Sequence, residues 1–212
     1  MKPLKDSRLY TFIDLAYIGN SDPLRIATEL CDGGSDIIQL RAKNWKADKI
    51  ATTAERLLKV LDHYDVPLVV NDHPNIARTV GAQFCHLGQE DFFDAGHSHI
   101  QHVQDSSKPI CWGLSTHSPK QAERAIDAKP DYIAIGPVYQ TGTKPTARPV
   151  TLKYVKWAAE NVHIPWFAIG GINMNTIEDV LSAGATRICV VSDILNAKDI
   201  KKKCLEYRKI IL

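Results

Sequence analysis

The sequence predicts an α/β protein that folds as a single (β/α)8 barrel over residues 1–212. Short apolar, β-branched runs alternate with longer amphipathic stretches along the chain, and there are eight such runs. Several runs lack polar alternation, which is typical of parallel strands that helices cover on both faces. No Gly/Ser-rich linker interrupts this order, so we expect no domain boundary. An open doubly wound sheet is the alternative, but the sequence lacks its N-terminal glycine-rich phosphate fingerprint.

The apolar runs are the expected strands, and each ends near a polar or glycine-containing segment. In chain order they are Leu9–Ile13, Asp36–Leu40, Pro67–Val70, Gln83–Leu87, Pro109–Gly113, Tyr132–Ile135, Pro165–Ile169 and Arg187–Val191. Regular spacing and the count of eight favour a closed barrel, because each strand is followed by a stretch long enough for a helix.

Amphipathic helices are expected between these strands. The pattern over Ala47–His63 places five apolar side chains on one helical face. The other periodic stretches are Pro119–Asp127, Leu152–Asn161, Asn175–Ala183, Ala197–Ile210 and the less regular Asp94–Gln104. We expect left-handed glycines to end helices at Gly33–Gly34, Gly81 and Gly184.

Composition and charge argue against several classes of protein. The 26 basic and 24 acidic residues leave a formal charge of +2, whereas nucleic-acid-binding proteins usually carry a marked basic excess. No apolar run approaches the ~20 residues of a membrane helix, and the N-terminus lacks the features of a signal peptide. Five cysteines without CxxC spacing are typical of reduced, mostly buried thiols. We therefore expect a cytoplasmic protein with no nucleic-acid or membrane partner.

Polar side chains gather after the predicted strands, on the rim where barrel enzymes carry out their chemistry. Arg41, Lys43 and Lys144 are cations suited to phosphate oxygens. The carboxylates of Asp72 and Asp91 follow neighbouring strands and suit Mg²⁺, which shares its coordination with substrate phosphates. Asp72 has an alternative role as the cap of the helix that follows it.

A second set of rim residues suits another anion. The loop Thr141–Lys144 is rich in hydroxyl and amide groups, and Gly170–Gly171 and Val191–Ser192 match a common phosphate site of barrels. His86 and His117 are interpreted as structural or contact residues. No nucleophile stands next to a base, so two facing anion sites favour metal-assisted displacement of a phosphate or pyrophosphate leaving group.

Seven short motifs follow the predicted strands in a fixed order. They are QLRAK (Gln39–Lys43), ND (Asn71–Asp72), HLGQED (His86–Asp91), GLSTH (Gly113–His117), GPVYQTGTK (Gly136–Lys144), AIGGI (Ala168–Ile172) and VVS (Val190–Ser192). Together they resemble the thiamine phosphate synthase family over nearly the whole chain. The resemblance implies a TIM barrel and a Mg²⁺-dependent transferase. Such enzymes join 4-amino-2-methyl-5-hydroxymethylpyrimidine diphosphate to a thiazole phosphate, giving thiamine phosphate and pyrophosphate.

The resemblance also implies a role for each matched residue. The pyrophosphate would be held by Arg41, Lys43, Asn71, Ser115 and Lys144, whose three cations are the expected catalytic residues. Gln39 would lie beside the pyrimidine, and Asp72 and Asp91 would bind Mg²⁺. The thiazole phosphate would be contacted by Thr141, Thr143, Gly171, Val191 and Ser192.

Three positions depart from the family pattern. Ala42 stands where an acidic residue is common, and its side chain is expected to point away from those of Arg41 and Lys43. Thr151 replaces a frequent glycine before a helix. Asp193 replaces a small residue beside the expected thiazole-phosphate site, so we expect it to point outward or to cap the last helix.

Two other functions fit the same barrel. One is a thiazole tautomerase, a related isomerase that would use a histidine such as His117 for proton transfer but tends to lack the complete pyrophosphate set. The other is a non-catalytic barrel that binds thiamine intermediates, which would have lost metal or cation residues. Barrels of this kind often associate, so a homo-oligomer is also an expectation.

Overall fold

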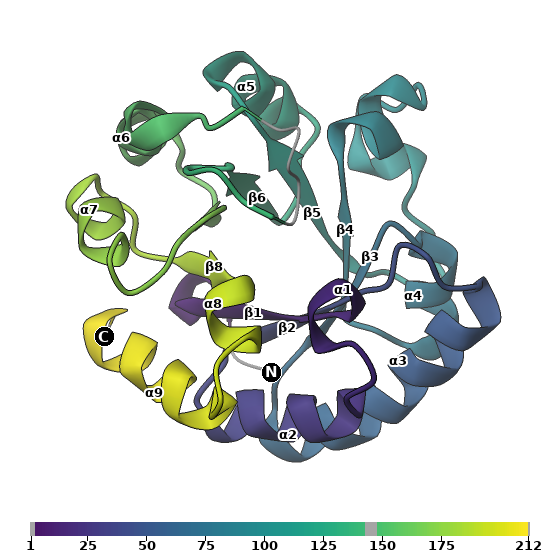
Figure 1. Ribbon diagram of the computed structural model, residues 1–212. Coiled ribbons are helices and arrows are strands. Elements are labelled where there is room, and N and C mark those ends of the chain that lie inside the picture. The colour runs from purple at the N-terminus through teal and green to yellow at the C-terminus, as the bar shows by residue number, and fades with distance from the viewer. Residues whose placement is uncertain (1–2, 143–147, 212) are drawn as a thin grey trace.

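Eight parallel strands close into a barrel in the computed structural model, which describes residues 3–142 and 148–211 (Figure 1). Each strand pairs with the next one, and the last pairs with the first through Leu9 and Ile188. The strands are β1 (Leu9–Asp14), β2 (Ile37–Arg41), β3 (Leu68–Asn71), β4 (Phe84–Leu87), β5 (Cys111–Thr116), β6 (Tyr132–Ile135), β7 (Trp166–Ile169) and β8 (Ile188–Val190). The predicted barrel is confirmed, and the open doubly wound alternative is wrong.

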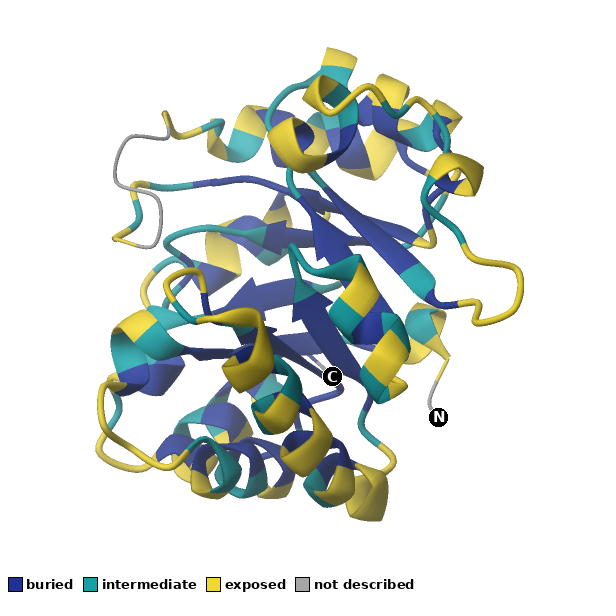
Figure 2. Cartoon of the chain, turned by 90° about the vertical axis from the view of Figure 1, so that its right-hand side faces the viewer, coloured by how far each residue is buried: buried dark blue, intermediate teal, exposed yellow. Residues whose placement is uncertain are grey.

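Helices surround the strands and turn their buried sides towards them, as the colouring by burial shows (Figure 2). The longer ones are α2 (Pro23–Asp32), α3 (Ala47–Leu61), α4 (Pro74–Val80), α5 (Pro119–Asp127), α6 (Thr151–Asn161), α7 (Ile177–Ser182) and α9 (Ile200–Ile211). The shorter ones are η1 (Leu4–Asp6), α1 (Leu15–Ile18), η2 (Asp62–Tyr64), η3 (Glu90–Asp94), η4 (Ile100–His102) and α8 (Ser192–Leu195). The predicted glycine stops are confirmed at Gly34, Gly81 and Gly184, whose φ angles are 84°, 78° and 100°.

Two predicted elements differ from the observed ones because of a glycine. The fifth strand continues past Gly113 to Thr116, since Gly113 pairs with both neighbouring strands instead of ending the strand. The helix predicted over Asp94–Gln104 is wrong. That stretch holds the end of the π-helical turn η3 and the 3-10 turn η4, and Gly96 with a φ of 91° interrupts it.

Two other predicted helices begin later than expected. The last long helix begins at Ile200 and not at Ala197, and the Asp199 side chain accepts a hydrogen bond from the Lys202 amide at 2.8 Å to start it. The helix predicted from Asn175 begins at Ile177, after an irregular turn.

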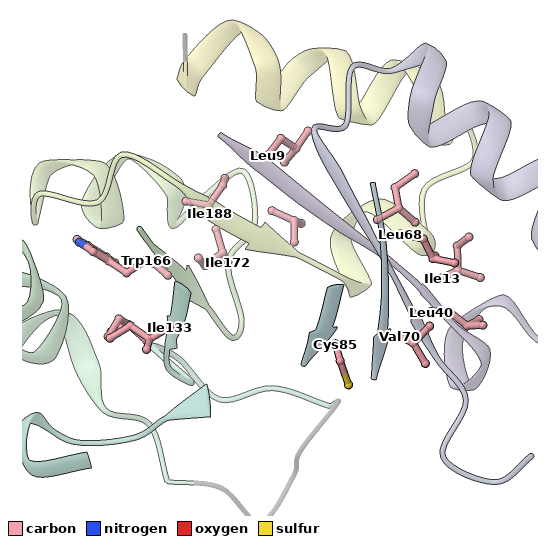
Figure 3. Close-up of a cluster of buried hydrophobic side chains, with 14 of the residues drawn as sticks. Leu9, Ile13, Leu40, Leu68, Val70, Cys85, Ile133, Trp166, Ile172 and Ile188 are labelled. Carbon is pink, nitrogen blue, oxygen red and sulfur yellow. The ribbon is translucent and has the colours of Figure 1, made fainter. Parts of the chain in front are cut away.

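Alternating side chains divide the interior into two packed regions. The larger one lies between the strands and the helices and contains Leu9, Leu40, Val70 and Ile188 (Figure 3). The smaller one fills the inside of the barrel and consists of Tyr10, Phe12, Ile37, Val69, Phe84, Tyr132, Phe167 and Cys189. This inner cluster is rich in aromatic rings, and it forms a floor beneath the carboxyl ends of the strands.

The cysteines and the helices agree with the expectations from composition. All five cysteines are free thiols, and Cys31, Cys85, Cys189 and Cys204 are buried. Within residues 3–142 and 148–211, no helix has the length and apolar character needed to cross a membrane.

Candidate active site

A pocket of about 990 Å³, including its open mouth, lies at the carboxyl ends of the barrel strands. Its floor includes Tyr10 and Phe12 from the inner cluster. The described residues among those predicted for the site all line it: Gln39, Arg41, Lys43, Asn71, Asp72, Asp91, Ser115, Thr141, Gly171, Val191 and Ser192. Thr143 and Lys144, which were also predicted, lie outside the described residues.

A buried carboxylate fixes the first cation of the pocket. Arg41 ends β2 opposite Asp14 at the end of β1, and its Nη1 lies 2.7 Å from Asp14 Oδ2. Asp14 is only 1% exposed, and its other oxygen accepts the Ala16 amide at 3.0 Å. The guanidinium is therefore held at one edge, which gives its remaining donors a defined direction. Asp14 was missed in the sequence because it follows an apolar run, and only the register with Arg41 reveals it.

Two carboxylates from neighbouring loops lie close together in the pocket. Burial and the charge of Asp91 raise the pKa of Asp72, against smaller opposite effects of Lys43, His73 and Arg41. Lys43 is half exposed and lies 3.7 Å from Asp72 Oδ2. A divalent cation held by both carboxylates would relieve the repulsion between them.

This carboxylate pair fits Mg²⁺ and not a metal held by protein alone. Among the residues that the structure describes, no three His, Cys, Asp or Glu side chains form a group able to hold a metal ion. Mg²⁺ is commonly bound by one or two carboxylates while substrate phosphates and water complete its coordination. Asp72 and Asp91 would supply that kind of partial coordination.

Asp72 also has an unusual backbone. Its φ is 63°, in the left-handed region that non-glycine residues seldom adopt, and its amide donates to the His86 carbonyl at 3.0 Å. The alternative role as a helix cap is wrong, because His73 is the N-cap residue of α4 and no side chain makes a capping hydrogen bond there. The local strain is instead associated with a carboxylate that faces the pocket.

The glycines after β7 bring two loops together on another wall. Gly171 has a φ of 67°, and a Cβ there would lie 2.7 Å from both the Gln140 carbonyl oxygen and Tyr139 Cβ. Because it has no side chain, Gly171 allows the β6 and β7 loops to pack closely together and leaves its own backbone accessible from the pocket. Nearby, Ser192 begins α8 directly after Val191.

A chain of hydrogen-bonded side chains crosses the floor of the pocket. Gln39 Nε2 donates to Tyr10 Oη at 2.7 Å, and the Tyr10 and Tyr132 hydroxyls lie 3.0 Å apart. His86 Nδ1 lies 3.0 Å from Tyr132 Oη, and His86 Nε2 lies 2.9 Å from Ser115 Oγ. The two tyrosines were predicted only as strand residues. The available signal was that a buried tyrosine hydroxyl usually needs a hydrogen-bond partner.

Gln89 ties the loop that carries Asp91 to the strand that carries Ser115. Its Nε2 donates to the Ser115 carbonyl at 2.6 Å, and its Oε1 accepts from Arg124 Nη2 at 2.6 Å. His117, which also lines the pocket, contacts the Gly136 carbonyl through Nδ1. These contacts hold the ends of β4, β5 and β6 in a fixed relation.

The three departures from the family pattern have clear positions. Ala42 is 7% exposed and packs in the larger core, away from the pocket, as expected. Asp193 also points away, but the expectation that it caps the last helix is wrong. Its Oδ2 accepts from the Tyr207 hydroxyl at 2.6 Å and lies 3.9 Å from Lys203 Nζ. Thr151 has a φ of 65°, which explains why glycine would suit this position.

The fold and the pocket together define a class of protein: a (β/α)8 barrel with a pocket at the carboxyl ends of its strands that contains both cations and carboxylates. The family model described as Thiamine monophosphate synthase matches residues 9–194. The chain belongs to the thiamine phosphate synthase family, and the resemblance of its seven motifs is confirmed.

Individual relatives agree with this assignment. Thiamine-phosphate synthase of Thermus thermophilus is 42% identical over 79% of this chain and 78% of its own length. The Halalkalibacterium halodurans enzyme of that name is 36% identical over 98% and 97%. Among solved structures, thiamine phosphate pyrophosphorylase from Pyrococcus furiosus has a TM-score of 0.85 at 28% identity, covering 98% of this chain and 96% of its own. A 3-hexulose-6-phosphate synthase, at 19% identity and a TM-score of 0.69, shares the fold alone.

Proposed function

We propose that this chain is a transferase that forms thiamine phosphate. It would join the pyrimidine diphosphate to a thiazole phosphate and release pyrophosphate, together with CO2 if the thiazole carries a carboxylate. The observation that carries the proposal is that all the described residues among those predicted for the site, which come from segments far apart in the sequence, line one pocket. Relatives named thiamine-phosphate synthase, at 36–42% identity, support it.

The residues on the cationic side suit a displacement in which negative charge grows on the leaving group. We expect Arg41, Lys43 and Lys144 to stabilise that charge, with Asn71 and Ser115 donating hydrogen bonds to the pyrophosphate. Because Arg41 is already fixed by Asp14, its charge needs little reorganisation as the bond breaks. The aminopyrimidine, beside Gln39, can stabilise the methylene cation that remains.

The opposite wall suits the second substrate. Gly171, Val191 and Ser192 would hold its phosphate through backbone and hydroxyl groups, and Thr141 and Thr143 would contact the thiazole. The thiazole nitrogen would then capture the methylene cation. Asp193 does not oppose this arrangement, since its carboxylate is turned towards α9.

Asp72 and Asp91 would hold Mg²⁺ together with the pyrophosphate oxygens. When bound, Mg²⁺ would supply positive charge to the departing pyrophosphate. Phosphorylated small molecules are therefore the partners we expect. A homo-oligomer and a cytoplasmic location stay predictions, which sedimentation and cell fractionation would check.

The decisive experiment measures pyrophosphate release and thiamine phosphate formation with Mg²⁺ and both substrates, and with each substrate alone. Both products should appear together and only when both substrates are present. Pyrophosphate release from the pyrimidine diphosphate alone at the same rate would indicate a hydrolase. Isomerisation of a thiazole phosphate that is not joined to the pyrimidine would favour the tautomerase alternative. Binding of the substrates without formation of any product would favour the non-catalytic barrel.

A matched pair of variants would locate the activity in the pocket. Lys43→Met removes a cation that lines the pocket, whereas Lys153→Met makes the same change on the exposed side of α6. We expect Lys43→Met to lower kcat by about 10²–10³-fold, by analogy with losing one donor to a developing anion. Lys153→Met should leave kcat unchanged, and equal losses in the two variants would contradict the placement of the site.

A further inference from the structure

The hydrogen-bonded chain beneath the pocket begins at a donor, the Gln39 side-chain nitrogen, and this favours one order of donors along it. Gln39 Nε2 donates to the Tyr10 oxygen, and the Tyr132 oxygen 3.0 Å away is then the acceptor for the buried Tyr10 hydroxyl proton, which would otherwise lose its hydrogen bond. By the same requirement, the acceptor for the Tyr132 hydroxyl proton is His86 Nδ1, 3.0 Å away. In this order of donors, neutral His86 carries its proton on Nε2 and donates it to Ser115 Oγ.

We propose that Tyr10, Tyr132 and His86 are positioning residues that make Ser115 a hydrogen-bond donor towards the leaving pyrophosphate. With its oxygen accepting from His86, the Ser115 hydroxyl proton is free to point into the pocket that this residue lines. Pyrophosphate oxygens only accept, so a donor is the group that they need. The inference rests on the proposed function, because it assigns how Ser115 meets the leaving group.

The opposite direction would disfavour the same ligand. If Ser115 donated to His86, its lone pairs would face the pyrophosphate and repel the phosphate oxygens. The order of donors therefore decides whether the Ser115 hydroxyl attracts or repels a phosphate oxygen. Burial raises the pKa of the Tyr10 and Tyr132 hydroxyls well above their usual range, so each has a proton to donate in this chain.

Gly113 leaves space for the ring of Tyr132, the central residue of the hydrogen-bonded chain. A Cβ at Gly113 would lie 2.1 Å from Tyr132 Cζ and 2.4 Å from its hydroxyl oxygen. Only glycine on β5 therefore allows the Tyr132 ring to reach between Tyr10 and His86. The ring stacks on His86 with centroids 5.6 Å apart and meets Tyr10 edge-on at 6.0 Å. This accounts for the glycine of the GLSTH motif.

The five members of the chain come from five strands, and all but Ser115, which is of intermediate exposure, are buried. Tyr10 and Tyr132 are 1% and 0% exposed, and Gln39 and His86 are 2% and 7% exposed. Gln89 independently fixes the Ser115 backbone through its carbonyl. Such a rigid, paired network can hold the orientation of one hydroxyl through several links.

Kinetics of Tyr→Phe variants test the proposal. Tyr132→Phe cuts the chain next to His86 and should lower kcat by about 10- to 100-fold, the range typical of residues that orient an active-site group. Tyr10→Phe cuts it farther away and should cost less, since Tyr132 can still donate to His86. The matched control is Tyr154→Phe, which removes another buried hydroxyl, bonded to Thr116 Oγ1 at 2.7 Å outside the pocket. It should leave kcat unchanged.

A double-variant comparison separates positioning from general destabilisation. In a Ser115→Ala background the group being oriented is gone, so adding Tyr132→Phe should change kcat little. His86→Gln, whose amide can still donate to Ser115, should retain more activity than His86→Ala. Equal losses in Tyr132→Phe and Tyr154→Phe, or full additivity with Ser115→Ala, would overturn the proposal.

The protonation of His86 gives a readout that needs no activity. In ¹⁵N-histidine-labelled protein at about pH 8, where imidazole is neutral, His86 should show a protonated Nε2 and an unprotonated Nδ1. The His86→Gln spectrum assigns the signals. A proton on Nδ1 would overturn the proposal even in an active enzyme. A wild-type protein that forms no thiamine phosphate would instead overturn the proposed function, whatever the histidine spectrum shows.

Discussion

At the scale of single residues, Asp72 combines several features that lower the stability of the folded protein with a position in the candidate site. Asp72 has a left-handed backbone, a half-buried carboxylate and a second carboxylate nearby, and each of these costs stability in the free protein. Such a residue persists because the surrounding strands hold it in place. Its charge would become favourable on binding of the proposed cation between the two carboxylates.

The Asp72→Asn variant should be more stable than the wild type at neutral pH in the presence of a chelator. Asparagine accepts the left-handed φ as well as aspartate does, so only the charge changes. The folded-state pKa of Asp72 is raised, so its ionised form destabilises the fold above that pKa. The gain should disappear as pH falls below the ordinary value of 3.8, where Asp72 is protonated both folded and unfolded. Urea unfolding across this pH range measures it.

Asp91→Asn tests the same repulsion through the second carboxylate. It removes the same repulsion from the other side, so it should also stabilise, and the double variant should gain less than the sum. The partly exposed contact between Lys43 and Asp72 is worth little and should not reverse the sign. A loss of stability at neutral pH in Asp72→Asn would show that a favourable contact of the carboxylate outweighs its repulsion from Asp91.

Thr151 is a residue whose conformation opposes its side chain. Its φ of 65° is costly for a β-branched residue, while its hydroxyl accepts from the Lys153 amide at 3.3 Å. Thr151→Asn tolerates the left-handed region and keeps an acceptor, so it should raise the free energy of unfolding by about 1 kcal/mol. Thr151→Ala removes the β-branch but loses the acceptor and gains no left-handed preference, so it should be less stable than Thr151→Asn. Denaturation midpoints with an unchanged m-value would check both, and a less stable Asn variant would contradict the strain.

At the scale of elements, α8 is anchored to α9 by the residue that looked anomalous in the sequence. Asp193 accepts from the Tyr207 hydroxyl, so the carboxylate secures the short helix that begins at Ser192. The two helices also pack against each other in the fold (Figure 1). A charge that seemed to oppose phosphate binding is therefore part of the support behind the site.

Asp193→Ala and Tyr207→Phe should each destabilise the fold by about 1.5–3 kcal/mol, as expected for a hydrogen bond to a charged group. The double variant should cost little more than either single one, because both remove the same contact. The KM for the thiazole phosphate should stay unchanged in Asp193→Ala. A lower KM would show that the carboxylate acts on the phosphate after all.

The elements were predictable from local pattern, while the contacts that tune the site were not. Strand and helix periodicity is local, and it gave the order and number of strands. Motif residues at strand ends could be assembled because a barrel brings all those ends to one rim. The link between Tyr10 and Tyr132 joins positions 122 residues apart, and that between Asp14 and Arg41 depends on strand register. Neither register nor hydrogen-bond partners can be read from periodicity alone.

At the scale of the whole molecule, the candidate site depends on closure of the barrel, because strands from all parts of the chain contribute to it. The pocket residues come from the carboxyl ends of strands that pair in a closed ring, so ligand contacts join the N-terminal and C-terminal parts of the chain. A ligand that binds only this closed arrangement stabilises the entire fold by mass action. Global unfolding can therefore report on the composition of the site.

Pyrophosphate with Mg²⁺ should raise the unfolding free energy of the barrel by about 2.7 kcal/mol at a hundred times its Kd. Pyrophosphate with a chelator should do less, because Asp72 and Asp91 would then face the anion without a cation between them. Mg²⁺ alone should also do less, because two carboxylates provide only part of its coordination. Thermal unfolding over a concentration series measures all three conditions, and Asp91→Asn should lose the Mg²⁺-dependent part. An equal shift with and without chelator would show that the carboxylate pair does not bind a cation together with the pyrophosphate.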